Sequence, residues 1–145
     1  MARPSVPIEI STPELRWQGR KLKVHFDIRF IGPEGKSQQG SLGGGESAGA
    51  ETVVAALNEA RTDSDIQAVV LRVDSPGGSG SAATLIEHAV ERLRQKKPVI
   101  VSMGNYAASG GYLVAMGGDM IFAEPTTLTG SIGVFVLKPD FSGLM

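Results

Sequence analysis

The chain has 145 residues and a formal net charge of −1, and 41% of its residues are hydrophobic and 20% charged. This length suits one domain with its own core, and this charge gives no electrostatic reason to expect a nucleic acid or an anionic membrane as a partner. The sequence has no cysteine, which excludes disulfides and thiolate metal sites, and no apolar run approaches the ~20 residues of a membrane span. Neither histidine, His25 or His88, belongs to a metal-binding pattern, so we expect no metal ion.

The first third of the chain is poor in helix signals. Residues 1–20 contain prolines and no helical period, which predicts an extended N-terminal arm or linker. Residues 22–30 alternate apolar and polar side chains, the pattern of a half-buried strand with His25 on its solvated face. Residues 32–49 are rich in glycine, serine and glutamine, which predicts a flexible loop. We therefore expect one domain over residues 21–145, preceded by the arm.

From residue 50 onward, helical periodicity alternates with short runs rich in valine and isoleucine. Helices are predicted over 50–60, from Ser79 or Ser81 to about Arg94, and from Ser109 to about Met116. Strands are predicted over 66–73, 98–103 and 120–123. The side chains expected to face the core from the second and third helices are Leu85, Ile86, Ala89, Val90, Leu93, Leu113 and Met116. This alternation predicts an α/β fold with a parallel sheet.

Two segments about thirty residues apart each follow a strand-like run and precede a helix-like run. Residues 73–78 read Val-Asp-Ser-Pro-Gly-Gly, which leaves backbone N–H groups free of side chains. Residues 105–112 read Asn-Tyr-Ala-Ala-Ser-Gly-Gly-Tyr, which places the Ser109 hydroxyl between small neighbours. A hydroxyl that faces exposed N–H groups is the minimum requirement for acyl transfer. Two simpler interpretations stay open, a helix N-cap for Ser109 and a plain strand–helix turn for the glycine pair.

A third segment, residues 128–135, reads Leu-Thr-Gly-Ser-Ile-Gly-Val-Phe. In this order the three segments resemble the signal peptide peptidase family, also called protease IV or peptidase S49, over roughly residues 46–145. The resemblance implies a Clp/crotonase-type α/β fold, a parallel sheet built from ββα units, with ring-like or dome-like homo-oligomers. It implies a serine peptidase that needs no cofactor and works outside the cytoplasm at a bacterial cell membrane, although this chain itself reads as soluble.

The resemblance also implies roles for particular residues. Ser109 matches the family's nucleophile. The backbone N–H groups of the Gly77–Gly78 pair and of Gly110 match the donors that hold the oxyanion. Ser131 matches the serine that helps to orient the catalytic lysine.

The general base is the missing part of this pattern. The family uses a Ser-Lys dyad, in which burial keeps the lysine neutral. The only lysine after Ser109 is Lys138, which matches no family position, and no repeat precedes the motifs. We therefore expect that this chain carries the serine but not its base, and that alone it is a weak or inactive peptidase.

The leading interpretation is a serine endopeptidase that cleaves hydrophobic peptides such as signal peptide remnants. One alternative is a non-catalytic assembly or binding module of the same fold. A second is a crotonase-like acyl-CoA enzyme, a group that does not need a serine at the position of Ser109. The apolar run at residues 132–137 predicts in addition that the chain self-associates.

Overall fold

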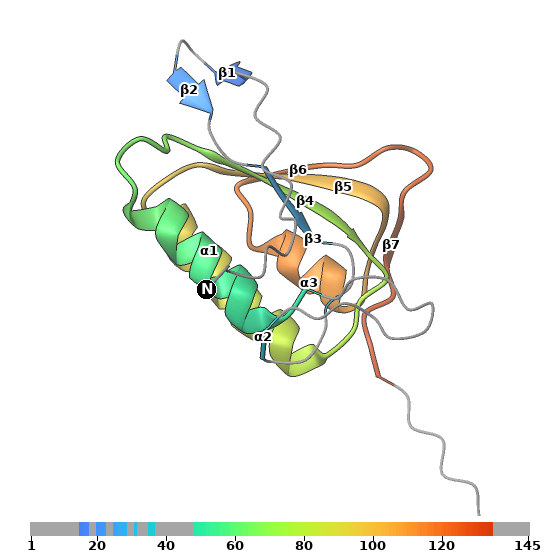
Figure 1. Cartoon of the computed structure of the whole chain (residues 1–145). Helices are drawn as coiled ribbons and strands as arrows, with labels where there is room; N and C mark the ends of the chain where they lie inside the picture. The colour runs from blue at the N-terminus through green and yellow to red at the C-terminus, as the bar shows by residue number, and fades with distance from the viewer. Residues whose placement is uncertain are drawn as a thin grey trace, which may run out of the picture.

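The computed structural model describes residues 15–17, 20–22, 25–28, 31, 35–36 and 48–134. In Figure 1, the described helices cover one face of a twisted parallel sheet. The described strands of this sheet are β3 (His25–Ile28), β4 (Val69–Ser75), β5 (Val99–Ala108), β6 (Met120–Phe122) and β7 (Leu128–Gly130). The helices are α1 (Ala50–Thr62), α2 (Gly80–Arg94) and α3 (Gly110–Met116). The predicted α/β fold with a parallel sheet is confirmed.

The strand order is β3-β4-β5-β6, and β7 pairs with the far end of β5. Strand β5 therefore has β6 beside its first half and β7 beside its second half. A separate antiparallel pair is formed by β1 (Leu15–Trp17) and β2 (Arg20–Leu22). The strand expected at 22–30 is thus divided, because Leu22 ends β2 whereas residues 25–28 form β3. Most of the glycine-rich stretch expected at 32–49 lies outside the described residues.

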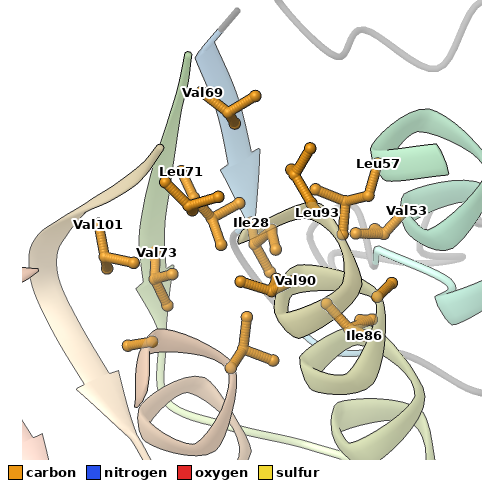
Figure 2. Packing of buried hydrophobic residues seen from close by; sticks show 14 of the residues in the cluster. Ile28, Val53, Leu57, Val69, Leu71, Val73, Ile86, Val90, Leu93 and Val101 are labelled. Carbon is orange, nitrogen blue, oxygen red and sulfur yellow. The ribbon is translucent and has the colours of Figure 1, made fainter. Parts of the chain in front are cut away.

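The core lies between the sheet and the helices. Along β4 every second side chain is fully buried, which is the period of a strand with one face against helices. Figure 2 shows side chains of β4 and β5 meeting those of α1 and α2, among them Leu71, Val101, Leu57 and Ile86. Burying a side chain of this size contributes about 1.5–3 kcal/mol. This packing holds the strands, and therefore their ends, in fixed positions relative to the helices.

Two side chains expected in this core are exposed. Leu85 is 46% exposed and Met116 is 51% exposed, so both predictions are wrong. In α2 the buried stripe is centred on Ile86 and Leu93, and at 100° per residue Leu85 lies just beyond its edge. In α3 the buried residues are the two leading glycines with Val114 and Ala115, which places Met116 on the opposite side.

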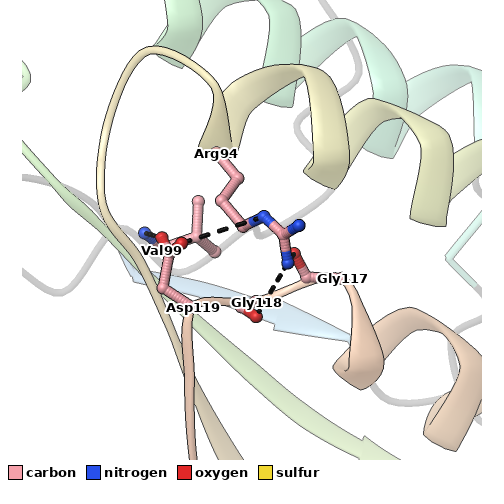
Figure 3. A network of polar contacts seen from close by, with 5 residues as sticks. All are labelled: Arg94, Val99, Gly117, Gly118 and Asp119. Atoms are coloured by element: carbon pink, nitrogen blue, oxygen red, sulfur yellow. Dashed lines mark hydrogen bonds and ion pairs between the residues drawn. The ribbon is translucent and has the colours of Figure 1, made fainter.

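The predicted 98–103 strand is longer in the structure, since β5 runs on to Ala108. Its start is tied to β6 by Asp119, whose carboxylate accepts a hydrogen bond from the N–H of Val99 at 2.8 Å. Figure 3 shows Arg94, at the end of α2, reaching the same carboxylate and the carbonyl groups of Gly117 and Gly118. A cation at these carbonyls stabilises the end of α3. None of the helices in the described ranges is long and apolar enough to cross a bilayer.

Candidate active site

Ser109 stands at the junction where β5 ends and α3 begins. Its backbone has φ 51° and ψ −118°, a conformation that is uncommon for any residue other than glycine. It occupies the N-cap position of α3, but its side chain makes no capping hydrogen bond. The hydroxyl is therefore not used in the way that most serines at helix starts are used. The side chain is half-buried.

Gly77 lies directly against Ser109. A Cβ atom added to Gly77 would come within 2.8 Å of the Ser109 Cβ and 3.2 Å of the Gly110 nitrogen. Gly77 also has a φ of 116°, which side chains disfavour. Its N–H donates to the hydroxyl of the buried Ser75 at 3.1 Å. The Gly77 backbone is thus fixed in a turn that only glycine can make beside the serine.

Gly78 is held from its other side by Ile31. The Ile31 N–H donates to the Gly77 carbonyl at 3.2 Å, and the Ile31 carbonyl accepts from the Ser79 N–H at 3.2 Å. These bonds form an isolated parallel bridge between Ile31 and Gly78. A Cβ atom at Gly78 would lie 1.9 Å from the Ile31 carbonyl oxygen, so no side chain fits there. Because the neighbours of Gly78 bond toward Ile31, its own N–H points to the opposite side.

The N–H groups of Gly78 and Gly110 come together beside the serine. The Cβ position of Gly110 is 3.7 Å from the Gly78 nitrogen. Gly110 is the first residue of α3, so its N–H has no partner within the helix. Within the described ranges, neither of these N–H groups donates a hydrogen bond. Two adjacent free donors next to a hydroxyl are the arrangement that oxyanion stabilisation requires.

Ser131 is brought beside Ser109 by the pairing of β5 with β7. Ala108 is level with Gly130, and the Ser109 N–H donates to the Gly130 carbonyl at 2.8 Å. Both serines follow directly after paired strands, and both have positive φ, since Ser131 is at 50°. Ser131 is exposed. The structure thus gathers all five residues that the sequence singled out, which are Gly77, Gly78, Ser109, Gly110 and Ser131.

Comparison with known proteins shows which family this chain resembles. The family model "Peptidase family S49" matches residues 91–145, which include Ser109 and Ser131. The chain is 48% identical over 97 residues to "Protease 4" of Haemophilus influenzae, covering 66% of this chain and 16% of that protein. It is 43% identical over 89 residues to "Serine protease SPPA, chloroplastic" of Arabidopsis thaliana, covering 61% of this chain and 13% of that protein. Over these residues the chain is similar to peptidase family S49.

The chain spans 16% or less of the length of these two relatives. Among solved structures it is similar to "ClpP1 N165D mutant from Listeria monocytogenes", with 20% identity and a TM-score of 0.46. That similarity covers 63% of this chain and 46% of the other.

Within the part of the chain that the structure describes, no candidate base contacts Ser109. His88 is exposed on α2, as expected, and its Nε2 lies 3.6 Å from a Glu87 carboxylate oxygen. Lys97 donates to the carbonyl groups of Ala60 and Asp63 at the end of α1. The His25 side chain and Lys138 lie outside the described residues.

Three residues that support the site were not predicted. Asp74 and Ser75 belong to the motif at residues 73–78. That motif does not show that Asp74 accepts from the Tyr106 N–H or that Ser75 accepts from the Gly77 N–H. Ile31 precedes the glycine-rich stretch and gave no signal at all. The only local hint was that a serine directly before proline and two glycines often bonds to the backbone of its own turn.

Proposed function

We propose that this chain carries the nucleophile and the oxyanion site of a serine endopeptidase. Its substrates would be extended hydrophobic peptides such as signal peptide remnants. The observation that carries the proposal is the convergence at Ser109. An uncapped serine in a strained backbone lies against Gly77 and next to the unused N–H groups of Gly78 and Gly110.

The chemistry follows from these positions. The Ser109 oxygen attacks the peptide carbonyl carbon, and the carbonyl oxygen gains negative charge as the tetrahedral intermediate forms. We assign the two stabilising donors to Gly78 and Gly110. The N–H of Gly77 is already engaged by Ser75, so Gly77 supplies shape rather than a donor. One such donor lowers the free-energy barrier by about 2.7–4 kcal/mol.

The proton of Ser109 needs an acceptor. We assign this role to a lysine contributed by a segment outside the described residues or by another polypeptide, with Ser131 as the residue that orients it. General-base catalysis contributes about 10²–10⁴-fold, so the chain alone should be a very weak peptidase. No cofactor takes part in this scheme.

Exposed apolar side chains lie next to the proposed site. Leu128, Ile132 and Val134 are 60%, 78% and 94% exposed, and they lie on β7 and in the residues that follow it. Apolar surface of this kind suits a hydrophobic peptide or a second copy of the chain. We propose both peptide binding and homo-oligomerisation at this surface, and membrane proximity rests only on the family.

A fluorophosphonate probe tests the nucleophile. Incubation of the purified chain with the probe, followed by peptide mass spectrometry, should find the phosphonyl group on Ser109. Ser109→Ala should abolish this label. Ser64→Ala, which removes an exposed serine in a turn, should leave it unchanged. Equal labelling of several serines, or none above the Ser109→Ala background, would contradict the proposal.

The second candidate is a non-catalytic module of the same fold. The lack of a base at Ser109 among the described residues favours it. Such a module should bind hydrophobic peptides equally well before and after Ser109→Ala, and it should not react with the probe.

A further inference from the structure

Strand β5 changes its register against β4 just before the site. From Val69 to Val73, each β4 residue pairs with the β5 residue 30 positions later, so Val73 pairs with Met103. The next pair joins Ser75 to Ala107, an offset of 32. Strand β5 therefore holds two extra residues between these pairs, within residues 104–106. A shift of two keeps the same side chains facing the core.

This double bulge decides which residue meets Gly77. With the first register continued, Gly77 would be level with Ala107, whereas an offset of 32 makes it level with Ser109. The contact of 2.8 Å between a Gly77 Cβ and the Ser109 Cβ agrees with the second register. Bulges commonly re-aim a side chain next to a functional site. Here the bulge brings a hydroxyl to the glycine turn where a methyl group would otherwise lie.

Asp74 is the β4 residue that faces the bulge. Its Oδ1 atom accepts a hydrogen bond from the Tyr106 N–H at 3.0 Å. A Cβ atom at Gly104 would lie 2.5 Å from the Asp74 carboxylate carbon, so the carboxylate occupies the space that a side chain would need. On the other side of the bulge, the Thr127 hydroxyl donates to the Gly104 carbonyl at 2.9 Å. Side chains thus bond to backbone groups at both ends of the segment that leaves the regular ladder.

We propose that Asp74 is a positioning residue for Ser109. Its carboxylate takes the place of the missing β4 carbonyl acceptor and holds the two extra residues of β5 in the bulge. Gly104 leaves room for that carboxylate. The register claim stands on the pairing alone, and its consequence for reactivity rests on the proposed function.

Amide hydrogen exchange on the ¹⁵N-labelled full chain, read by NMR, tests the register claim. Asp74→Ala should raise the exchange rate of the Tyr106 N–H about tenfold or more, as loss of a charge-assisted hydrogen bond predicts. It should also raise exchange of the Ser109 N–H, which bonds to Gly130. The amides of Val101 and Met103, before the bulge, should not change.

Two further variants separate the carboxylate acceptor from general destabilisation. Asp74→Asn keeps an oxygen at the acceptor position and should restore most of the protection. Gly104→Ala keeps the carboxylate but displaces it, and it should reproduce the exchange pattern of Asp74→Ala. If Asp74→Ala leaves Tyr106 and Ser109 protected, or if it speeds exchange equally along all of β5, the proposal is wrong.

The rate of fluorophosphonate labelling provides the second readout. Asp74→Ala should lower the labelling rate of Ser109 about tenfold, and Asp74→Asn should recover it. If even the unmodified chain does not label, the proposed function fails while the exchange result still decides the register claim. If exchange changes as expected but labelling does not, Asp74 holds the bulge without positioning the serine, and the positioning claim is overturned.

Discussion

The two halves of β5 are held in place by different interactions. The first half, from Val99 to Met103, is a regular strand whose alternate side chains are buried between the helices and the sheet. The second half begins at Gly104, exposes Asn105 and Tyr106, and exchanges β6 for β7 as its neighbour. Backbone pairing and apolar burial hold the first half. The second half depends on glycine, positive φ and side chains that bond to the backbone.

This contrast indicates how one strand can combine stability with a reactive end. In a buried, regular ladder a polar side chain is costly unless it is hydrogen-bonded, so a hydroxyl there is not left free for a substrate. An irregular end can present one, because its backbone groups are free to point outward. Changes in the first half should therefore alter the free energy of unfolding, whereas changes around the second half should alter reactivity.

The largest effect is expected in the regular half of the sheet. Leu71 is fully buried on β4 opposite Val101, and Leu71→Ala should lower the free energy of unfolding by about 2–5 kcal/mol. Urea denaturation measures the change. The control Leu85→Ala, at an exposed leucine of α2, should change stability by no more than about 0.5 kcal/mol. Under native conditions the folded fraction of Leu71→Ala should still label at Ser109 at the normal rate. A slower rate would show that the regular half of the sheet also controls reactivity.

The next effect is expected at the glycine turn. Gly78→Ala places a Cβ 1.9 Å from the Ile31 carbonyl oxygen at a φ of 146°, so the Gly78 N–H must move. The rate of Ser109 phosphonylation should fall about 10²–10³-fold, as for loss of one oxyanion donor. Gly80→Ala is the matched control, because a Cβ there meets nothing within 4 Å. Unchanged labelling of Gly78→Ala would remove Gly78 from the oxyanion site.

The smallest effect is expected on α2, away from the site. Burial, then the charge of Glu91, raises the pKa of Glu87 above its usual value. The folded state therefore holds the Glu87 proton more tightly than the unfolded state does, so this group's stabilising contribution is lost as pH rises through the raised pKa. Glu87→Gln should stabilise the chain by about 0.2–0.5 kcal/mol at neutral pH, the size of a like-charge helix pair.

That gain should vanish below the usual pKa of glutamate, where Glu87 is protonated in both states. Thermal or urea unfolding across pH 3 to 8 follows the difference, with Glu59→Gln as an exposed control on α1. The labelling rate of Ser109 should be the same in both variants. A gain that persists in acid would show that the charge of Glu87 is not its cause.

Most elements of the fold and the residues of the candidate site were predicted from patterns along the chain. Periodicity predicted all three helices and the β4, β5 and β6 strands, because a face buried against a layer leaves a repeat of 3.6 or 2 in the chain. The motifs identified Ser109, Ser131 and the glycines, because close backbone approach requires small residues there. Local rules placed the ends less well: β5 was expected to stop at residue 103 and runs on to Ala108.

The way these residues meet depends on contacts that the sequence patterns do not show. The offset of 32 that makes Gly77 level with Ser109 depends on a bulge, and the bulge depends on a carboxylate 32 residues away from the N–H it accepts from. The backbone hydrogen bonds of Ile31 with Gly77 and Ser79 join positions 46 or more residues apart. Backbone atoms are the same in every residue, so these bonds leave no pattern in the sequence. Leu85 and Met116 were placed inward because they are apolar, yet the width of each buried stripe is set by the neighbouring layer. A sequence records which side chains are apolar or small, whereas the register between strands is settled by contacts that form only when the layers assemble.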